Sequence, residues 1–316
     1  MYSKIIVPLD GSDLAERALP LAQLVAGALS IPMELVEAFN VLPPAVHNRS
    51  SRLTLEMMLA EQRRRAQRYL SEVQERLQPS SYPLTTATLG GWPEQAIVDW
   101  AGEDPDALIV MTTHGRGGLA RWAIGSVVDR VLHTVSNPVL IVRASATEIV
   151  QEGVRTMLVP LDGSDLAETA LDHAVNLAAA LDASVSLIRT THTRRYYRSH
   201  AVGLAVAIGQ SPDSWVNDLM GDDAIEATDY LTRVQGRLTA ERPEIDRVDT
   251  LHLLHDSPAQ AIIDRADLQP TLIVMTSHAR AGLGRLLLGS VTDRVVRHSD
   301  APVLVIRPHT GTRAQG

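Results

Sequence analysis

The feature that most constrains this chain is an internal repeat, because its two halves carry the same sequence blocks in the same order. Residues Val7–Glu16 recur without change as Val159–Glu168. Shorter blocks repeat further along each half, namely Pro93–Val98 with Pro258–Ile263 and Pro138–Arg143 with Pro302–Arg307. Blocks that recur in the same order indicate a repeated structural unit. The chain is therefore a tandem duplication whose halves should share one fold.

The domain limits follow from the ends of the repeated blocks. We expect a first domain over residues 1–143 and a second over 154–308. The polar segment 144–153 is the expected linker, and 309–316 is the expected tail. With 316 residues, the chain is long enough for two such domains, each with its own core.

Composition excludes several classes of protein. An apolar fraction of 45% is typical of a soluble globular protein. A net charge of −8 argues against wholesale binding to nucleic acid or to an anionic membrane. The chain has no cysteine, which excludes disulfides and thiolate metal sites and is in keeping with a cytoplasmic protein. Neither an export signal nor a membrane span is visible.

Short β-branched runs alternate with longer helical patterns in the first half. The predicted strands are 4–9, 33–39, 84–89, 107–112 and 139–142, and the predicted helices are 14–29, 51–78, 93–101 and 126–135. Asp13 and Glu16 are predicted to cap the first helix as N-cap and reciprocal partner. Continuous apolar strands between amphipathic helices indicate a parallel sheet covered on both faces. Each half should be a five-stranded, doubly wound, Rossmann-like α/β domain.

The second half departs from the first by an enlarged segment at about 192–221, between the strand near 185–189 and the helix near 222–238. One interpretation is a surface loop with a helical turn. The other is a lid or a partner-binding element, because long insertions in compact domains are often functional.

A glycine-rich stretch at 111–126 supplies the main functional signal. It leaves an apolar strand, passes Gly115, Gly117 and Gly118, and reaches Gly125-Ser126 at the start of a helix. A helix start presents unpaired N–H groups and the positive end of the helix dipole to an anion. The stretch recurs at 275–290, so each half carries one candidate nucleotide loop.

Taken together, these motifs resemble the universal stress protein family in its tandem two-domain form. The resemblance rests on the Pro-Leu-Asp-Gly-Ser strand exit, the Gly-Ser helix start and the closing Pro-Val-Leu strand. It implies a sheet in the order 3-2-1-4-5, domain pairing through the fifth strands at 139–142 and 303–306, and ATP binding in some members. Exposed apolar edges invite such pairing, and the helix faces leave a homodimer open as well.

The family's nucleotide pattern is Gly, two residues, Gly, nine residues, then Gly followed by Ser or Thr. The first half matches it with Thr112, Gly115, Gly125 and Ser126, and the second with Thr276, Ala279, Gly289 and Ser290. Thr replaces the first glycine in both halves. Ala279 is the more serious departure, because a positive φ there would cost about 1 kcal/mol. We therefore expect the first half to be the better site.

Asp10 and Asp162 end the first strand of each half. With the strand order that the resemblance implies, ligands would bind beyond strands one and four. The resemblance assigns Asp10 to the adenosine part and the loop N–H groups and Ser126 to the phosphates. The alternatives are an aspartate that only forms a turn with Gly11 and Ser12, and a Ser126 that only caps its helix.

Other polar residues of the loops carry a weaker signal. Arg116, like Arg280, could pair with phosphate oxygens or be a solvated loop residue. His114 and His278 are expected to make local hydrogen bonds. Strand alternation puts His252 and His255 on opposite faces, which argues against a metal site.

The function that these features predict is that of a cytoplasmic stress-response protein that binds ATP, ADP or AMP, with or without Mg²⁺. The alternative is a scaffold that acts through protein contacts and binds no nucleotide. Phosphate-loop, dinucleotide and nucleophile-elbow motifs are absent from the sequence, and no general base can be named. We therefore do not expect an enzyme, although slow ATP hydrolysis through a bound Mg²⁺ is compatible with the sequence.

Overall fold

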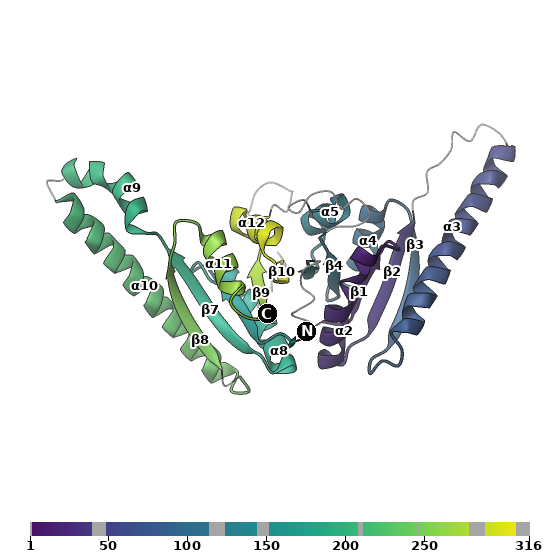
Figure 1. Ribbon diagram of the computed structural model, residues 1–316, viewed down its shortest axis with the longest axis horizontal. Coiled ribbons are helices and arrows are strands. Elements are labelled where there is room, and N and C mark those ends of the chain that lie inside the picture. The colour runs from purple at the N-terminus through teal and green to yellow at the C-terminus, as the bar shows by residue number, and fades with distance from the viewer. Residues whose placement is uncertain are drawn as a thin grey trace, which may run out of the picture. The chain divides into compact units, whose positions relative to one another are not determined.

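A computed structural model describes residues 2–39, 49–113, 124–143, 152–207, 211–245, 247–277 and 288–307. Contacts divide the chain into two units, each with its own core (Figure 1). The first unit is Met1–Gln151 with Ser277–Leu288 and Leu304–Gly316, and the second is Glu152–Thr276 with Gly289–Val303.

The first unit alternates strands and helices along the chain. Its elements are β1 (Ile5–Leu9), α1 (Asp13–Glu16), α2 (Leu19–Leu29), β2 (Met33–Phe39), α3 (Arg49–Arg76), β3 (Leu84–Gly90), α4 (Pro93–Gly102), β4 (Leu108–Thr112), α5 (Ser126–Thr134) and β5 (Val139–Val142).

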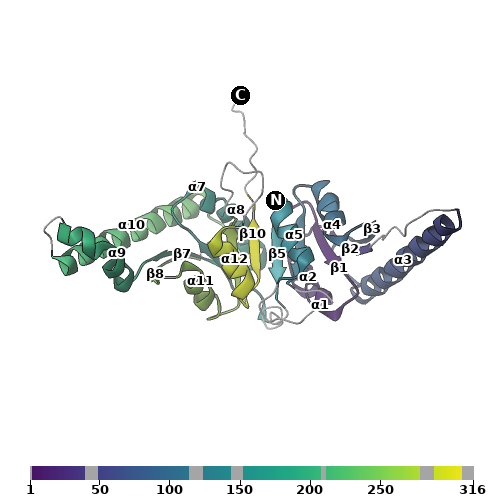
Figure 2. The same cartoon turned by 90° about the horizontal axis from the view of Figure 1, so that it is seen from above.

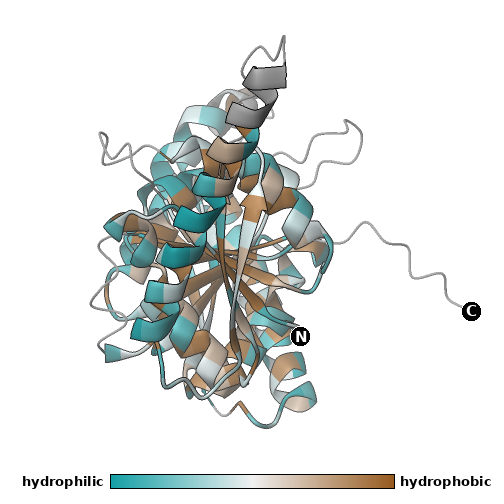
Figure 3. Cartoon of the chain, turned by 90° about the vertical axis from the view of Figure 1, so that its right-hand side faces the viewer, coloured by the Kyte–Doolittle hydropathy of each residue, from teal (hydrophilic) through white to brown (hydrophobic). Residues whose placement is uncertain are grey.

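The five strands of this unit run parallel in the order β3-β2-β1-β4-β5. Helices α2 and α3 lie on one face of the sheet and α4 and α5 on the other (Figure 2). Every residue of β1, β4 and β5 is buried. Figure 3 shows mainly hydrophobic strands behind the hydrophilic outer surface of the long helix α3. A sheet covered on both faces excludes water from continuous apolar strands, which is why these short β-branched runs form its centre.

The second unit repeats this succession of elements. It contains β6 (Thr156–Pro160), α7 (Asp165–Glu168), α8 (Ala170–Leu181), β7 (Ser184–Thr191), α9 (Arg194–Ala207), α10 (Pro212–Glu241), β8 (Val248–Leu254), α11 (Pro258–Ala266), β9 (Thr271–Thr276) and α12 (Ser290–His298). The last strand, β10 (Val303–Ile306), follows α12 in the chain, and its residues from Leu304 onward are grouped with the first unit.

Strand pairing in the second unit matches that in the first. β6 pairs in parallel with both β7 and β9, and β7 pairs with β8. Ahead of β10, the N–H of Ile273 on β9 donates to the carbonyl of Pro302 at 2.9 Å. The predicted α/β fold with a parallel sheet and tandem units is confirmed.

Two local predictions are wrong. The helix predicted over 14–29 is broken into α1 and α2 at Arg17 and Ala18, because Pro20 has no N–H to donate to the carbonyl of Glu16. The insertion is no surface loop, since α9 follows β7 closely and α10 already begins at Pro212.

Within the described part of the chain, no helix is both long and apolar enough to cross a membrane.

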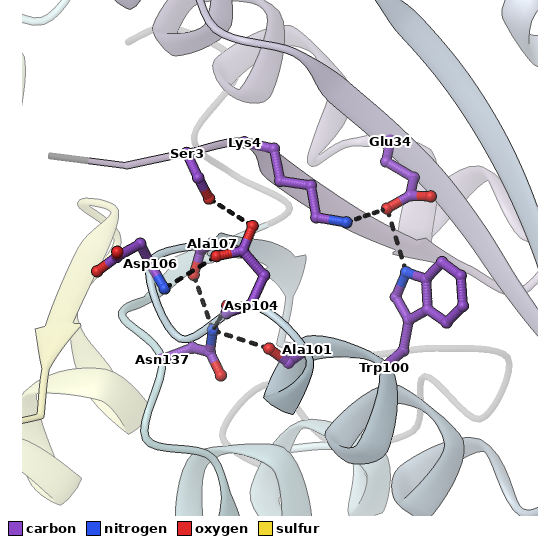
Figure 4. Close-up of polar contacts among 9 residues, drawn as sticks. All are labelled: Ser3, Lys4, Glu34, Trp100, Ala101, Asp104, Asp106, Ala107 and Asn137. Atoms are coloured by element: carbon purple, nitrogen blue, oxygen red, sulfur yellow. Dashed lines mark hydrogen bonds and ion pairs between the residues drawn. The ribbon is translucent and has the colours of Figure 1, made fainter.

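Polar contacts hold the amino-terminal edge of the first sheet together (Figure 4). The fully buried amide nitrogen of Asn137 lies 3.2, 2.8 and 3.1 Å from the carbonyls of Ala101, Asp104 and Ala107. Asn137 therefore joins the end of α4, the turn before β4 and the start of β5. Its position fixes where β4 and β5 begin.

A neighbouring contact at the same edge joins two more strands to α4. The carboxylate of Glu34 accepts from Lys4 at 2.8 Å and from the indole N–H of Trp100 at 3.1 Å (Figure 4). With this edge closed by side chains, the opposite edge, where the strands end, is left for a binding site.

Replacement of Asn137 tests how much this buried amide stabilises the fold. Asn137→Ala should lower the free energy of unfolding by about 2 kcal/mol, because it removes a buried amide donor that three carbonyls share. Urea denaturation followed by tryptophan fluorescence measures the loss. Asn217→Ala removes an exposed amide that bonds Arg194 and should change stability by no more than about 0.5 kcal/mol. Equal, small losses in both variants would contradict this role of Asn137.

Candidate functional site

The carboxyl ends of β1 and β4 separate although the strands are neighbours. Their ladder aligns only Ile5 with Leu108 and Ile6 with Ile109. By contrast, β1 and β2 stay aligned as far as Leu9. The chain winds from β1 towards β2 on one side and returns to β4 on the other, so the direction of winding reverses here. Ligands of open α/β sheets bind in the crevice at such a switch point.

The ends of the candidate loop meet at this crevice. Thr112 is the last, buried residue of β4, and the N–H of Gly125 donates to the carbonyl of Thr113 at 2.7 Å. Gly125 is the N-cap of α5 and Ser126 its first residue. The structure thus brings Thr112, Gly125 and Ser126 together.

The N-cap of α5 is Gly125, which makes no side-chain cap hydrogen bond, so the interpretation of Ser126 as the helix cap is wrong. An N-cap glycine has no side-chain oxygen to accept from the first turn of the helix. Ser126 is exposed and one position too late to cap. The first N–H groups of α5 are therefore placed for an external acceptor.

The second unit has the same arrangement at α12. Gly289 is its N-cap without a side-chain hydrogen bond, and Ser290 is its exposed first residue. The hydroxyl of Thr292 donates to the carbonyl of Thr276 at 2.9 Å and ties α12 to the end of β9. Ser290 is thus no cap either.

Asp10 forms the turn after β1. One carboxylate oxygen accepts from the N–H of Ser12 at 3.0 Å and from its hydroxyl at 2.6 Å. The Ser12 oxygen in turn accepts from the N–H of Ala15 at 3.1 Å and caps α1. The expected N-cap Asp13 is therefore wrong, because the chain enters the helix one residue earlier. Gly11 at φ +77° allows the turn.

Asp162 repeats these contacts in the second unit. Its carboxylate accepts from the N–H and hydroxyl of Ser164 at 3.0 and 2.6 Å, and Ser164 caps α7. Turn formation is thus one role of both aspartates. It orients each carboxylate at the end of the first strand of its unit.

Several predicted loop residues lie outside the described residues. These are His114, Gly115, Arg116, Gly117, Gly118, His278, Ala279 and Arg280.

Sequence reasoning missed a contact between the long helix and the turn in each unit. In the first unit, the Tyr69 hydroxyl donates to one oxygen of Glu16 at 2.9 Å, and Arg76 donates to the other at 2.7 Å. In the second, Tyr230 and Arg237 bind Glu168 in the same way. These contacts hold α1 and α7 beside α3 and α10.

The signal for these contacts was a further repeated block, Tyr-Leu-x-x-Val-Gln-x-Arg, at 69–76 and 230–237. Its glutamine acts alike in both units: Gln74 donates to the carbonyl of Leu84 at 2.7 Å, and Gln235 to that of Val248 at 2.6 Å. The block therefore packs the long helix against the outer strand.

Burial, the hydrogen bond to Glu16 and the nearby carboxylates of Glu16, Glu37 and Asp10 raise the pKa of Tyr69. Burial, the hydrogen bond to Glu168 and the carboxylates of Glu168 and Asp162 raise the pKa of Tyr230, whereas Arg189 lowers it. Both phenols are therefore neutral donors well above neutral pH.

Two arginines that end the fifth strands were also missed. Arg143 and Arg307 are buried at equivalent positions, and burial lowers the pKa of Arg307. Next to Arg307, the N–H of Ser277 donates to the carbonyl of Ile306 at 2.9 Å. Each arginine thus follows the strand beside the start of a candidate loop.

An open depression of about 640 Å³ lies where α3 contacts α1. Its lining is formed by Glu16, Tyr69, Glu72, Glu75 and Arg76. It is shallow and mixed in charge, so we place the candidate site at the ends of β1 and β4 instead.

His252 and His255 each have a local hydrogen-bond partner. The Nε2 of His252 lies 2.6 Å from the Thr191 hydroxyl, and the Nδ1 of His255 accepts from the N–H of Ser257 at 2.9 Å. Among the described residues, no three His, Asp or Glu side chains are grouped closely enough to hold a metal ion.

Comparison with known proteins decides the family. The model of the universal stress protein family matches residues 1–143 and again residues 153–307. The chain belongs to the universal stress protein family.

Similar proteins agree with this membership. A universal stress protein of Methanocaldococcus jannaschii is 30% identical over 157 residues, which is 48% of this chain and 82% of that protein. One from Mycolicibacterium smegmatis is 28% identical over 207 residues, 64% of this chain and 62% of the relative. The crystal structure of a universal stress protein from Archaeoglobus fulgidus shares the fold, with a TM-score of 0.65, 17% identity and coverage of 97% and 99% of the two chains.

Removal of one half-buried hydroxyl tests the contact between Tyr69 and Glu16. Tyr69→Phe should lower the free energy of unfolding by about 1–2 kcal/mol, because the carboxylate loses a donor. The pKa of Tyr69 is raised in the fold, so the contribution is complete below about pH 10, where an unfolded tyrosine begins to ionise, and declines only above it. Urea denaturation at pH 8, 10 and 11 measures both effects.

Tyr82→Phe is the matched control, since the buried Tyr82 hydroxyl has no hydrogen-bond partner among the described residues. Its removal should leave stability unchanged or slightly higher. A loss in Tyr82→Phe as large as that in Tyr69→Phe would show that the hydroxyl-to-carboxylate bond is not what stabilises the helix contact.

Proposed function

We propose that this universal stress protein binds ATP, or a related adenine nucleotide, at the separated ends of β1 and β4 in its first unit. Asp10 would contact the adenosine part, as the family resemblance implies. Thr112, Gly115, Arg116, Gly125 and Ser126 would surround the phosphates. Binding would convey stress through conformation rather than through catalysis.

The observation that carries this proposal is the uncapped start of α5 at the strand reversal. Its first N–H groups have no side-chain acceptor in their own N-cap, and Ser126 adds an exposed hydroxyl. Phosphate oxygens satisfy such groups and also gain from the helix dipole. The donor set of this edge therefore fits a phosphate.

Thr112 does not obstruct this fit. It ends β4 in strand conformation, and the described residues other than glycine with positive φ are only Ser30 and Asp182. Thr276 has the same place in β9, which makes an equivalent second site at Asp162, Gly289 and Ser290 part of the proposal. Ala279 is the reason to rank that site lower for ATP.

The proposal also concerns a metal ion, the pairing of the two units and the location of the protein. Mg²⁺ could accompany the phosphates and permit slow hydrolysis, but no residue is proposed as a catalytic base. Pairing of the units through β5 and β10 and a homodimer are further parts of the proposal, supported by the apolar sequence of both strands. Localisation in the cytoplasm stays a prediction.

Substitution of the turn aspartates tests the proposed site. Asp10→Ala should weaken ATP binding at least about tenfold, because a charge-assisted contact to the nucleoside is lost. Calorimetric titration of the full chain gives affinity and stoichiometry, with about one ATP expected for each chain. Gly115→Val should weaken binding as well by blocking the approach of a phosphate.

Asp162→Ala is the matched control, because it disrupts the same turn in the second unit. It should leave the high-affinity ATP site intact. Unchanged affinity in both Asp10→Ala and Gly115→Val would reject the first-unit site, and failure of the wild-type chain to bind any nucleotide would favour the scaffold alternative.

A further inference from the structure

The two units carry opposite charges at the end of their second strand. Pro8 aligns with Val36 in the first unit, and Pro160 aligns with Ile188 in the second. Val36 is followed by Glu37 in the first unit, and Ile188 is followed by Arg189 in the second. Two units that otherwise repeat the same turn therefore differ in the group that stands beside it.

Arg189 is held in place beside the turn of the second unit. Its guanidinium carbon lies 5.0 Å from the centre of the Tyr230 ring, and Nη2 donates to Glu226 at 3.0 Å. A Cβ added to Gly163, at φ +92°, would lie 3.5 Å from the guanidinium. Arg189 is thus stacked, anchored and in direct contact with the turn that contains Asp162.

The guanidinium keeps donors to spare. Its side chain is only 17% exposed, and its one hydrogen bond within the described residues, to Glu226, uses one of five N–H groups. A planar, fixed fork of N–H groups suits a pair of adjacent acceptors. An oriented guanidinium with remaining donors, beside the switch point of the sheet, is equipped to bind a ligand.

The first unit offers the opposite chemistry. Glu37 is half-buried and lies close enough to Tyr69 for its carboxylate, with those of Glu16 and Asp10, to raise the pKa of that phenol. A carboxylate only accepts hydrogen bonds. At the matching position the second unit donates and the first unit accepts.

The long helix beside the second strand, α3 in the first unit and α10 in the second, also carries opposite charges in the two units. Glu226 stands four residues before Tyr230, and Arg65 stands four residues before Tyr69. The charges of strand and helix are therefore reversed together between the units. If the strand residue or the helix residue had only lost its role, the charge of one of them would have changed. Instead, the charges on the strand and on the helix are both reversed.

The position of these residues assigns them to the base end of a nucleotide. Phosphates at the start of α5 or α12 lie beside β4 or β9, and the second strand of each unit lies two strands away, about 10 Å across the sheet. A group near the end of β2 or β7 is therefore closer to the base than to the phosphates, and Arg189 lies on the face of the sheet that α10 covers.

Resting on the nucleotide binding proposed above, we infer that Arg189 makes the second site prefer a base with adjacent acceptors, such as guanine or hypoxanthine. Glu37 makes the first site prefer adenine, which has a 6-amino donor where guanine and hypoxanthine have the O6 acceptor. Arginine binds the O6 and N7 acceptors of guanine in a bidentate manner, and a carboxylate accepts from an exocyclic amino group. The tandem chain is then a receptor for two kinds of purine nucleotide.

Titration of the full chain with ATP, GTP and inosine triphosphate tests this inference. Inosine triphosphate shares O6 and N7 with GTP and lacks its 2-amino group. In an Asp10→Ala background, which weakens the first site, GTP and inosine triphosphate should bind more tightly than ATP. Arg189→Gln should weaken both at least about tenfold and remove the preference.

Two further variants sharpen the test. Arg247→Gln makes the same change at an exposed arginine that bonds Asp182 at the other end of the sheet, and it should leave binding unchanged. The double variant Glu37→Arg with Arg65→Glu, in an Asp162→Ala background, should gain affinity for inosine triphosphate. Arg189→Lys keeps the charge without the fork and should also lose the preference, which covers the case that Arg189→Gln does not fold.

Different failures separate this inference from the proposed function. In the Asp10→Ala background, equal affinities for ATP, GTP and inosine triphosphate, unchanged when Arg189→Gln is added, would overturn the base preference and leave nucleotide binding intact. A loss in Arg189→Gln confined to adenosine 3′,5′-bisphosphate would overturn it by assigning Arg189 to a phosphate. If ATP, GTP, inosine triphosphate and adenosine 3′,5′-bisphosphate all failed to bind, both the base preference and the proposed nucleotide binding would be overturned.

Discussion

The arrangement of this protein depends on the burial of both faces of a parallel sheet. Strands such as β1 and β4 are apolar in nearly every residue, so helices must cover each face. Right-handed crossovers reach both faces only if the chain winds outward from β1 in two opposite directions. The reversal separates the ends of β1 and β4, and the crevice there is a consequence of covering the sheet. The site is thus placed by the same constraint that builds the core.

Identical sequence in the two units gives nearly identical local structure. The Asp-Gly-Ser turn has hydrogen bonds of 3.0 and 2.6 Å in both, and the serine caps the next helix at 3.1 Å in both. Such contacts span two or three residues and need no help from the rest of the fold. Differences between the units, namely α9 and the exchanged charges at Glu37 and Arg189, are therefore the places where their functions can diverge.

Membership of the universal stress protein family accounts for the shared features but not for these differences. The family model matches residues 1–143 and 153–307, whereas Arg189 and its stacking on Tyr230 occur in only the second of these ranges. A duplicated chain can keep one unit for the inherited ligand and alter the other. The reversal of charge on both strand and helix is the kind of change that such divergence leaves.

Sequence alone determined the duplication, the α/β class and most strand limits, because β2 and β5 follow directly from apolar runs between breakers. It also placed Gly125 and Ser126 at a helix start, since that signal is local. It missed the break at Arg17, which one proline decides, and the role of Ser12 as cap, which depends on a shift of one residue. It also missed the helix α9, where helix propensity is marginal. Only the tertiary structure joined Tyr69 and Arg76 to Glu16 and set Arg189 against Gly163, because these residues are 26 to 60 positions apart in the chain. Contacts of that range depend on how helices cross the sheet, and no local pattern of residues encodes that crossing.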